Sequence, residues 1–164
     1  MELVEEIRSY RQEWLDHGGR SNGDGGLQYS DDIGAWIDLC HLRENPETNP
    51  DPQWADAEQY LLMRTGTSRI LGMLNFRHRL NDYLAEYAGH IGYGVRPSEW
   101  KKGYAKRMLS LCLERCREYG LDSVLITCDH TNEASRRTIL SCGGMFERTT
   151  TNGDETLERY WIHL

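Results

Sequence analysis

The stretch IGYGVRPSEWKKGYAKR, residues 91–107, decides how the rest of the chain is interpreted. It begins with a short apolar run interrupted by glycines, a pattern that predicts a strand approached closely by another backbone segment. Arg96 precedes a proline, which restricts it to extended geometry and ends the strand. Gly103 then opens an amphipathic helix. The first N–H groups of a helix lack intrahelical partners and its dipole favours negative charge, so we predict that this turn holds a pyrophosphate.

Basic residues gather in the same stretch. Residues 96–107 hold five of them and a single acid, Glu99, within a chain whose net charge is −7. A solvated helix start explains any one lysine, but basic residues at a helix N-terminus oppose the dipole unless an anion offsets them. The cluster therefore favours a phosphate-rich ligand. Its members are Arg96, Lys101, Lys102, Lys106 and Arg107.

Length and composition predict one globular domain over residues 1–164. The net charge and a pI near 5.4 argue against a nucleic-acid or membrane-surface binder. No apolar run approaches the roughly 20 residues of a membrane span, and the acidic N-terminus differs from a secretory signal. Five cysteines at irregular spacing predict free thiols in a reducing, cytoplasmic compartment, and their spacing does not predict a metal site.

Hydrophobic periodicity predicts mixed helices and strands on either side of the central stretch. We expect a first helix from about residue 3 that ends near Gly18-Gly19, and further helices from Asp31 or Asp32 to 41, over 104–119 and over 132–142. We expect strands over 58–64, 69–77, 90–95, 123–128, 145–151 and 156–162. The strand before the third helix and the strand after it predict a parallel pair, because such crossovers join parallel neighbours. The connection 77–87 mixes charge with aromatic rings, which suits a polar acceptor site and equally a surface loop anchored by tyrosines.

Two motifs carry a family resemblance. The segments GYGVRPSEWKKGYA and TNEASRRTILSCGG, with the order of elements, resemble the GNAT acetyltransferases, and most of all a subgroup of small bacterial members. The resemblance is firmest over residues 90–144. It implies an α/β fold with a mixed, mostly antiparallel sheet that contains one parallel strand pair and is flanked by helices. It also implies acetyl-CoA as co-substrate and an amine as acceptor. The family's usual first strand is missing before the N-terminal helix.

The family's pyrophosphate loop, Arg/Gln-x-x-Gly-x-Gly/Ala, falls on residues 100–105. Gly103 and Ala105 fit, whereas Trp100 replaces the leading Arg or Gln, and neighbouring lysines are expected to restore the charge. By the same resemblance, backbone groups of residues 93–95 pair with the pantetheine arm and polarise the thioester carbonyl. The cofactor-binding residues implied are Tyr93, Gly94, Val95, Trp100, Lys101, Lys102, Gly103, Tyr104, Ala105, Asn132 and Ser135.

The groups for proton transfer are not where the family keeps them. Ile139 stands at the position of a tyrosine that protonates the leaving thiolate, and the position of the glutamate base falls near Gly89. The candidates that remain near the predicted site are Glu86, His90, Asp129 and Ser135. Each has an ordinary alternative: a strand-end histidine is a common core or surface residue, and Asp129 suits the start of a turn. Asn132, likewise, has two interpretations, a helix cap and a cofactor contact, and one Asn can serve as both.

Two functions remain open on these observations. The first is an N-acetyltransferase that moves the acetyl group of acetyl-CoA directly to a primary amine of a small molecule or peptide. The second is a non-catalytic acyl-CoA-binding or regulatory module, which the vacant acid and base positions would suit. Exposed strand edges and a C-terminal hairpin are compatible with a homodimer.

Overall fold

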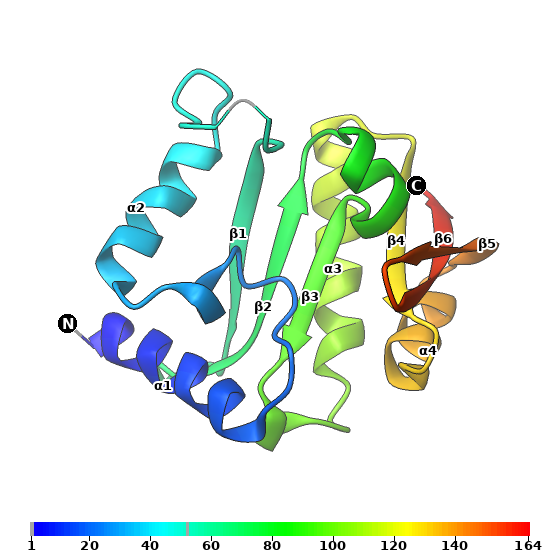
Figure 1. Cartoon of the computed structure of the whole chain (residues 1–164). Coiled ribbons are helices and arrows are strands. Elements are labelled where there is room, and N and C mark those ends of the chain that lie inside the picture. The colour runs from blue at the N-terminus through cyan, green and yellow to red at the C-terminus, as the bar shows by residue number, and fades with distance from the viewer. Residues whose placement is uncertain (1, 52) are drawn as a thin grey trace.

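The computed structural model describes residues 2–51 and 53–164, and within them the strands form two antiparallel three-stranded sheets (Figure 1). The first sheet has the order β1-β2-β3 and the second the order β4-β6-β5. The strands are β1 (Ala57–Met63), β2 (Ile70–Arg77), β3 (Ile91–Val95), β4 (Ser123–Asp129), β5 (Met145–Asn152) and β6 (Glu155–His163). The helices are α1 (Glu2–His17), α2 (Ile33–Arg43), α3 (Tyr104–Tyr119) and α4 (Glu133–Ser141). The predicted mixed α/β architecture with flanking helices is confirmed.

Helices cover both faces of the first sheet (Figure 1). On one face α1 and α2 pack their apolar stripes against the strands, as Ile7 and Trp36 do against Met73. On the other face α3 packs against β2 and β3, and its buried residues also meet the second sheet. The helix α3 therefore joins the two sheets in one core. Among the described residues, no helix has both the length and the apolar character that crossing a membrane requires.

Local signals placed most element ends correctly. Asp32 caps α2, accepting a hydrogen bond from the Ala35 N–H at 3.0 Å. Gly120 ends α3 in the left-handed conformation, with φ +98°. One difference lies in the connection 78–89, where Leu84–Ala88 forms a π-helical turn that the sequence pattern did not predict.

Two glycines of β3 admit another backbone segment, as their pattern predicted. Gly92 and Gly94 face the loop after α1, and a Cβ added to Gly94 would lie 2.6 Å from the Asn22 carbonyl oxygen. A Cβ added to Gly23 would lie 2.4 Å from the Gly92 carbonyl oxygen. Gln59 holds this loop in place, because its Nε2 donates to the Gly23 carbonyl at 2.8 Å. The loop therefore crosses directly over the strand that was predicted to contact the cofactor.

The parallel ladder expected between β3 and β4 is not formed in the described residues. The two strands belong to different sheets and meet only at the start of β3, where Gly89 forms a single bridge with Ile126. Gly89 has φ +68°, and a Cβ there would lie 2.3 Å from the Leu125 carbonyl oxygen. This bend directs the chain away from β4, and β3 then follows β2 instead. One edge of β3 is consequently left without a strand partner.

Candidate functional site

The turn before α3 has the backbone geometry of an anion site. Lys101 has φ +63° and is the one non-glycine residue in the described part of the chain with a positive φ. Gly103 follows with φ +82° and begins α3 without a side-chain cap. Left-handed residues at such a turn direct neighbouring N–H groups to one side, and the first N–H groups of the helix are unbonded within it. These features fit a bound phosphate.

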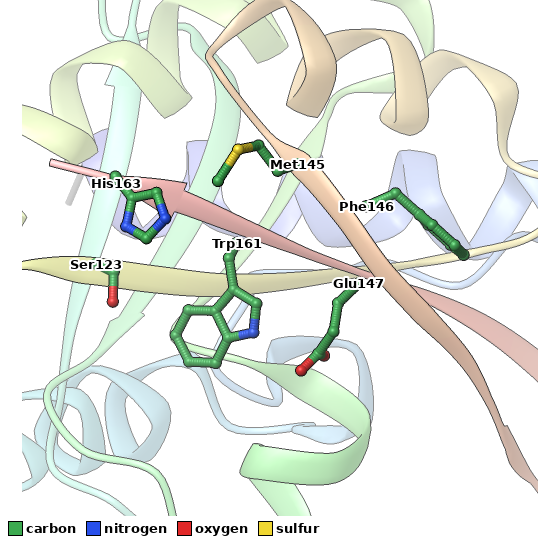
Figure 2. Close-up of a pocket in the computed structure, with 6 residues that line it drawn as sticks. All are labelled: Ser123, Met145, Phe146, Glu147, Trp161 and His163. Atoms are coloured by element: carbon green, nitrogen blue, oxygen red, sulfur yellow. The ribbon is translucent and has the colours of Figure 1, made fainter.

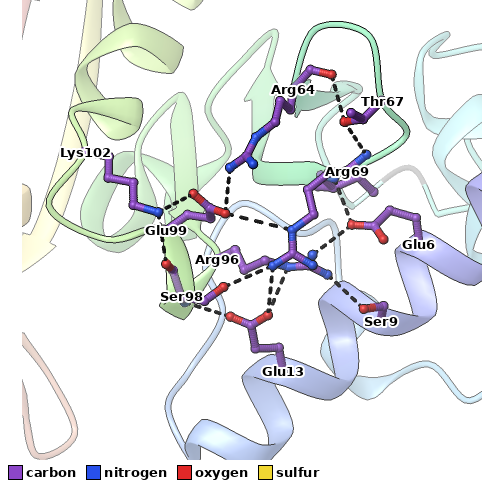
Figure 3. A network of polar contacts seen from close by, with 11 residues as sticks. Glu6, Ser9, Glu13, Arg64, Thr67, Arg69, Arg96, Ser98, Glu99 and Lys102 are labelled. Carbon is purple, nitrogen blue, oxygen red and sulfur yellow. Dashed lines mark hydrogen bonds and ion pairs between the residues drawn. The ribbon is translucent and has the colours of Figure 1, made fainter.

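The basic residues of this turn have different roles. Glu99, buried at 5% exposure, accepts a hydrogen bond from Lys102 Nζ at 2.8 Å and one from Arg64 at 2.9 Å (Figure 3). The Lys102 ammonium lowers the pKa of Glu99. Burial opposes this shift, the charges of Arg64 and Arg69 add to it, and the net pKa lies below its ordinary value. Lys102 is thus neutralised by a buried carboxylate, although half of its own side chain is exposed. In the described residues, Lys101, Lys106 and Arg107 have no carboxylate within 4.0 Å and supply the exposed charge.

Arg96 belongs to the interior rather than to the phosphate-facing cluster in which it was counted. Its side chain is fully buried, with Glu6 at 2.8 Å and Glu13 at 3.2 Å, both from α1 (Figure 3). The Tyr10 ring lies 5.5 Å from its guanidinium carbon. Glu13 also accepts the Ser98 N–H at 2.7 Å. The helix α1 therefore fixes the segment that leads into the turn.

Trp100 closes the turn instead of extending toward a ligand. Its indole N–H donates to the Val95 carbonyl at 2.7 Å. The ring packs edge-on against His17 at the end of α1, with the centroids 4.7 Å apart. Trp100 thus stabilises the loop through contacts within the protein.

The free edge of β3 carries two of the three predicted backbone positions. The Arg77 N–H donates to the His90 carbonyl and the Arg96 N–H to the Leu71 carbonyl, which sets the phase of the β2–β3 ladder. In an antiparallel ladder alternate residues face the partner strand, so Gly94 is turned to β2. The N–H and C=O groups of Tyr93 and Val95 therefore point the other way, toward the side where β4 diverges.

The side chain of Tyr93 crosses from β3 to the start of α4. Its hydroxyl lies 2.8 Å from Ser135 Oγ. Asn132 is the N-cap of α4, with its Oδ1 accepting the Ser135 N–H at 3.1 Å, so the cap interpretation is confirmed. Burial raises the pKa of the Tyr93 phenol above its ordinary value, which keeps it protonated. The sequence predicted a backbone role for Tyr93 at the site, but it did not predict the contact of the Tyr93 side chain with Ser135.

The three titratable candidates are held in structural interactions. Burial, and then the nearby Arg77, lower the pKa of His90 to about 4, and its Nδ1 accepts the Leu125 N–H at 2.9 Å. Arg148 grips both carboxylate oxygens of Glu86 and lowers its pKa to about 2. Asp129 accepts a hydrogen bond from the Thr131 N–H at 2.8 Å in a turn. The Thr131 hydroxyl and N–H lower the pKa of Asp129. None of the three matches a general base for neutral pH.

Arg77 is a charged residue that the sequence reading placed only at the edge of a possible acceptor loop. It lies at the end of β2, and its Nη1 donates to the carbonyls of Ala88 and Gly89, each at 3.1 Å. Its position next to the predicted central strand is set by β2–β3 pairing, a long-range contact that local patterns do not reveal.

A separate hollow of about 440 Å³ lies on the second sheet (Figure 2). It is lined by Ser123, Met145, Phe146, Glu147, Trp161 and His163. None of the predicted site residues lines it. Figure 2 shows the Trp161 indole between the Ser123 and Glu147 side chains, and the centroid of this ring lies 6.4 Å from that of the His90 ring.

Comparisons with known proteins agree on one family. The family model described as an acetyltransferase (GNAT) domain matches residues 23–145. No sequence among curated proteins matches the chain. A proposed ribosomal-protein-serine acetyltransferase from Vibrio cholerae has a similar structure, with a TM-score of 0.67 at 18% identity over 98% of this chain and 88% of that one.

Two further solved structures are similar in fold. A mutant of the spermidine N-acetyltransferase from Vibrio cholerae has a TM-score of 0.65 at 11% identity, covering 98% of this chain and 90% of that one. A proposed acetyltransferase from Salmonella typhimurium, solved with its cofactor acetyl-CoA, has a TM-score of 0.58 at 19% identity, covering 81% and 74%. The family model spans most of the chain, and the fold and the turn before α3 agree with it: the chain belongs to the GNAT family of acetyl-CoA-dependent acetyltransferases.

Proposed function

We propose that this chain transfers the acetyl group of acetyl-CoA directly to a primary amine of a small molecule or peptide. One observation carries the proposal. The free edge of β3 and the uncapped start of α3 lie on one short segment, residues 93–105, so a backbone site for a pantetheine arm adjoins a backbone site for a pyrophosphate.

The cofactor site would be built mostly from the main chain. The N–H groups of Gly103, Tyr104 and Ala105 would receive the phosphates, with Lys101 as the exposed charge. The N–H and C=O groups of Tyr93 and the N–H of Val95 would receive the arm, since the Val95 carbonyl already accepts the Trp100 indole N–H. Lys102 would act indirectly, through Glu99, by keeping the turn in shape. Preorganised N–H groups are effective because they need no rearrangement when charge develops on the thioester oxygen.

The reaction forms an N–C bond and breaks the C–S bond of the thioester, and acetyl-CoA supplies the activated acetyl group. One proton must leave the amine and one must reach the sulfur. A lysine-like ammonium with a pKa near 10.4 is neutral in only about one molecule in a thousand at pH 7.4. With His90, Glu86 and Asp129 engaged elsewhere, we propose that the neutral amine is drawn from solution.

Ser135 is the chain's best-placed group for the second proton. Its Oγ lies at the start of α4 beside the free edge of β3, and the Tyr93 hydroxyl at 2.8 Å orients it. The cap formed by Asn132 fixes the Ser135 backbone at the same time. Tyr93 and Ser135 together would take the place of the tyrosine that is replaced by Ile139.

The second candidate function is a non-catalytic acyl-CoA-binding module. The structural interactions of the acid and base candidates favour it. Glu86 and His90 serve the packing of the two sheets, as they would in a protein that no longer performs catalysis. Calorimetry with acetyl-CoA and CoA, followed by thiol release across amines, separates the two. The amines should include spermidine and a serine-containing peptide, since two proteins of similar structure are named as a spermidine and as a proposed ribosomal-protein-serine acetyltransferase. Binding with turnover supports the enzyme, binding without turnover supports the module, and absence of binding refutes both.

A further inference from the structure

Arg77 combines two features: no acid neutralises it, and its guanidinium lies beside β3. Its guanidinium is half-buried at the end of β2. Nη1 donates to two main-chain carbonyls, whereas Nε and Nη2 have no hydrogen-bond partner among the described residues. No carboxylate of residues 2–51 or 53–164 lies within 4.0 Å of it. Comparable arginines are paired: Arg96 with Glu6 and Glu13, and Arg159 with Glu147.

The position of this unpaired charge is beside the predicted reaction centre. A Cβ added to Gly92 would lie 3.1 Å from Arg77 Nη2, so the guanidinium rests against the residue just before Tyr93. Gly92 faces the loop after α1, while the neighbouring side chain of Tyr93 reaches α4. Arg77 therefore lies on the face of the first sheet opposite α3. A ligand held at the start of α3 would meet its acceptor from that face.

A half-buried charge without a counter-ion is costly, and an anionic group on a ligand would offset that cost. Burial lowers the pKa of Arg77 to about 10, which leaves it cationic at neutral pH. The two free donors, Nε and Nη2, are on one edge of the planar guanidinium, and such an edge binds a carboxylate with two parallel hydrogen bonds. Glu86, the acid of the adjacent π-helical turn, is held by Arg148 instead.

We propose that Arg77 binds an anionic group on the acceptor, so that the preferred acceptors are amines that also carry a carboxylate, such as amino acids or acidic peptides. This inference rests on the proposed acetyltransferase function and names its substrate class. It does not require a second site, because the same guanidinium that lies against β3 would hold the acceptor's carboxylate beside the point of transfer.

The test compares matched acceptors that differ in the carboxylate: lysine with cadaverine, tyrosine with tyramine, and peptides that begin with Asp with those that begin with Asn. For the wild-type protein we expect kcat/KM to be about 10- to 100-fold higher for the carboxylate-bearing member, the usual range for hydrogen bonds to a charged group. Arg77→Gln should remove most of that preference by raising KM for the acidic members, with little change for the neutral ones. Arg77→Lys should restore part of it.

Arg43→Gln is the matched control. Arg43 is also half-buried with no carboxylate within 4.0 Å among the described residues, but it lies over Trp54 and donates to the Gly25 carbonyl. It should leave the preference unchanged. The affinity for acetyl-CoA and the melting temperature are measured for each variant, and the wild-type preference by itself tests the proposal if Arg77→Gln fails to fold.

Three results would overturn the inference: equal turnover of acidic and neutral amines by the wild-type protein, an unchanged preference in Arg77→Gln, or an equal loss for both classes of acceptor. The last would place Arg77 on the thioester instead. Acetylation without a preference for acidic amines would sink this inference alone. Failure to bind acetyl-CoA, or to acetylate any amine, would refute the proposed function and this inference with it.

Discussion

Acidification from pH 7 to pH 4.5 should remove a defined part of the folding stability through the His90 side chain. His90 is 7% exposed and sits at the junction of the two sheets. Its backbone N–H donates to the Leu125 carbonyl at 2.8 Å, and its Nδ1 accepts the Leu125 N–H at 2.9 Å. Protonation of Nδ1 would break the second bond and place a charge in the interior near Arg77.

The sign and size of the effect follow from the pKa. The pKa of His90 falls from 6.5 to about 4 on folding, so between these values the unfolded chain binds a proton that the folded one does not. Stability is therefore complete above pH 6.5 and is lost as the pH falls toward 4. With about 1.4 kcal/mol for each pKa unit, the loss at pH 4.5 is about 2.5 kcal/mol. Carboxylates such as Glu58 and Glu86, with pKa values lowered from 4.5 to about 2, begin to lose their contribution near pH 4.5 and lose most of it below that pH, in the wild-type protein and in its variants alike.

Urea unfolding at pH 7, 6, 5 and 4.5 measures this loss. In His90→Asn the Oδ1 atom can still accept the Leu125 N–H but does not titrate, so the free energy of unfolding of this variant should fall by about 2.5 kcal/mol less than that of the wild-type protein over this range. The exposed His163 gives a matched control, and His163→Asn should follow the wild-type profile. Equal acid losses in the wild-type protein and in His90→Asn would refute the assignment.

Four further predictions concern the site. Gly103→Glu should abolish acetyl-CoA binding in calorimetry by steric and charge clash with the phosphates, whereas Gly66→Glu, at a similar φ of +77° in the β1–β2 turn, should bind normally. Asn132→Ala should lose about 1 kcal/mol in denaturant unfolding through its cap, and a weaker affinity for acetyl-CoA as well would show a cofactor contact. Tyr93→Phe should lower kcat about tenfold with a small change in KM for acetyl-CoA, because Ser135 loses its orienting bond; an unchanged kcat would remove this pair from the mechanism. The logarithm of kcat/KM should rise with a slope near one between pH 7 and 9, since the neutral amine reacts, and a flat profile would indicate a base in the chain.

Local chemistry in the sequence was enough for the elements and for the turn before α3. Gly92 and Gly94 predicted close backbone approach, and the loop after α1 provides it. Gly103 predicted the start of the helix, where its positive φ excludes most other residues. These features depend on neighbours in the chain, so the sequence displays them directly.

Long-range partners were not predictable in the same way. His90 and Glu86 were candidates because of their residue types, and their pKa values depend on Leu125 and Arg148, which are distant in the chain. The missing parallel ladder had a similar origin. The crossover rule applies to strands of one continuous sheet, but the bend at Gly89 depends on contact with β4. A sequence pattern shows which titratable side chains are present, but it does not show which distant residue pairs with each of them.

The burial of Arg96 has a consequence for any shortened version of the protein. The family match begins at residue 23, but the carboxylates of Glu6 and Glu13, which neutralise this guanidinium, precede that boundary. A fragment trimmed to the matched region would lose both counterions of Arg96 together with α1, the helix that covers it, and would expose the apolar residues that α1 buries on the first sheet. We therefore expect the stretch that defines membership of the family to be much less stable by itself than the whole chain.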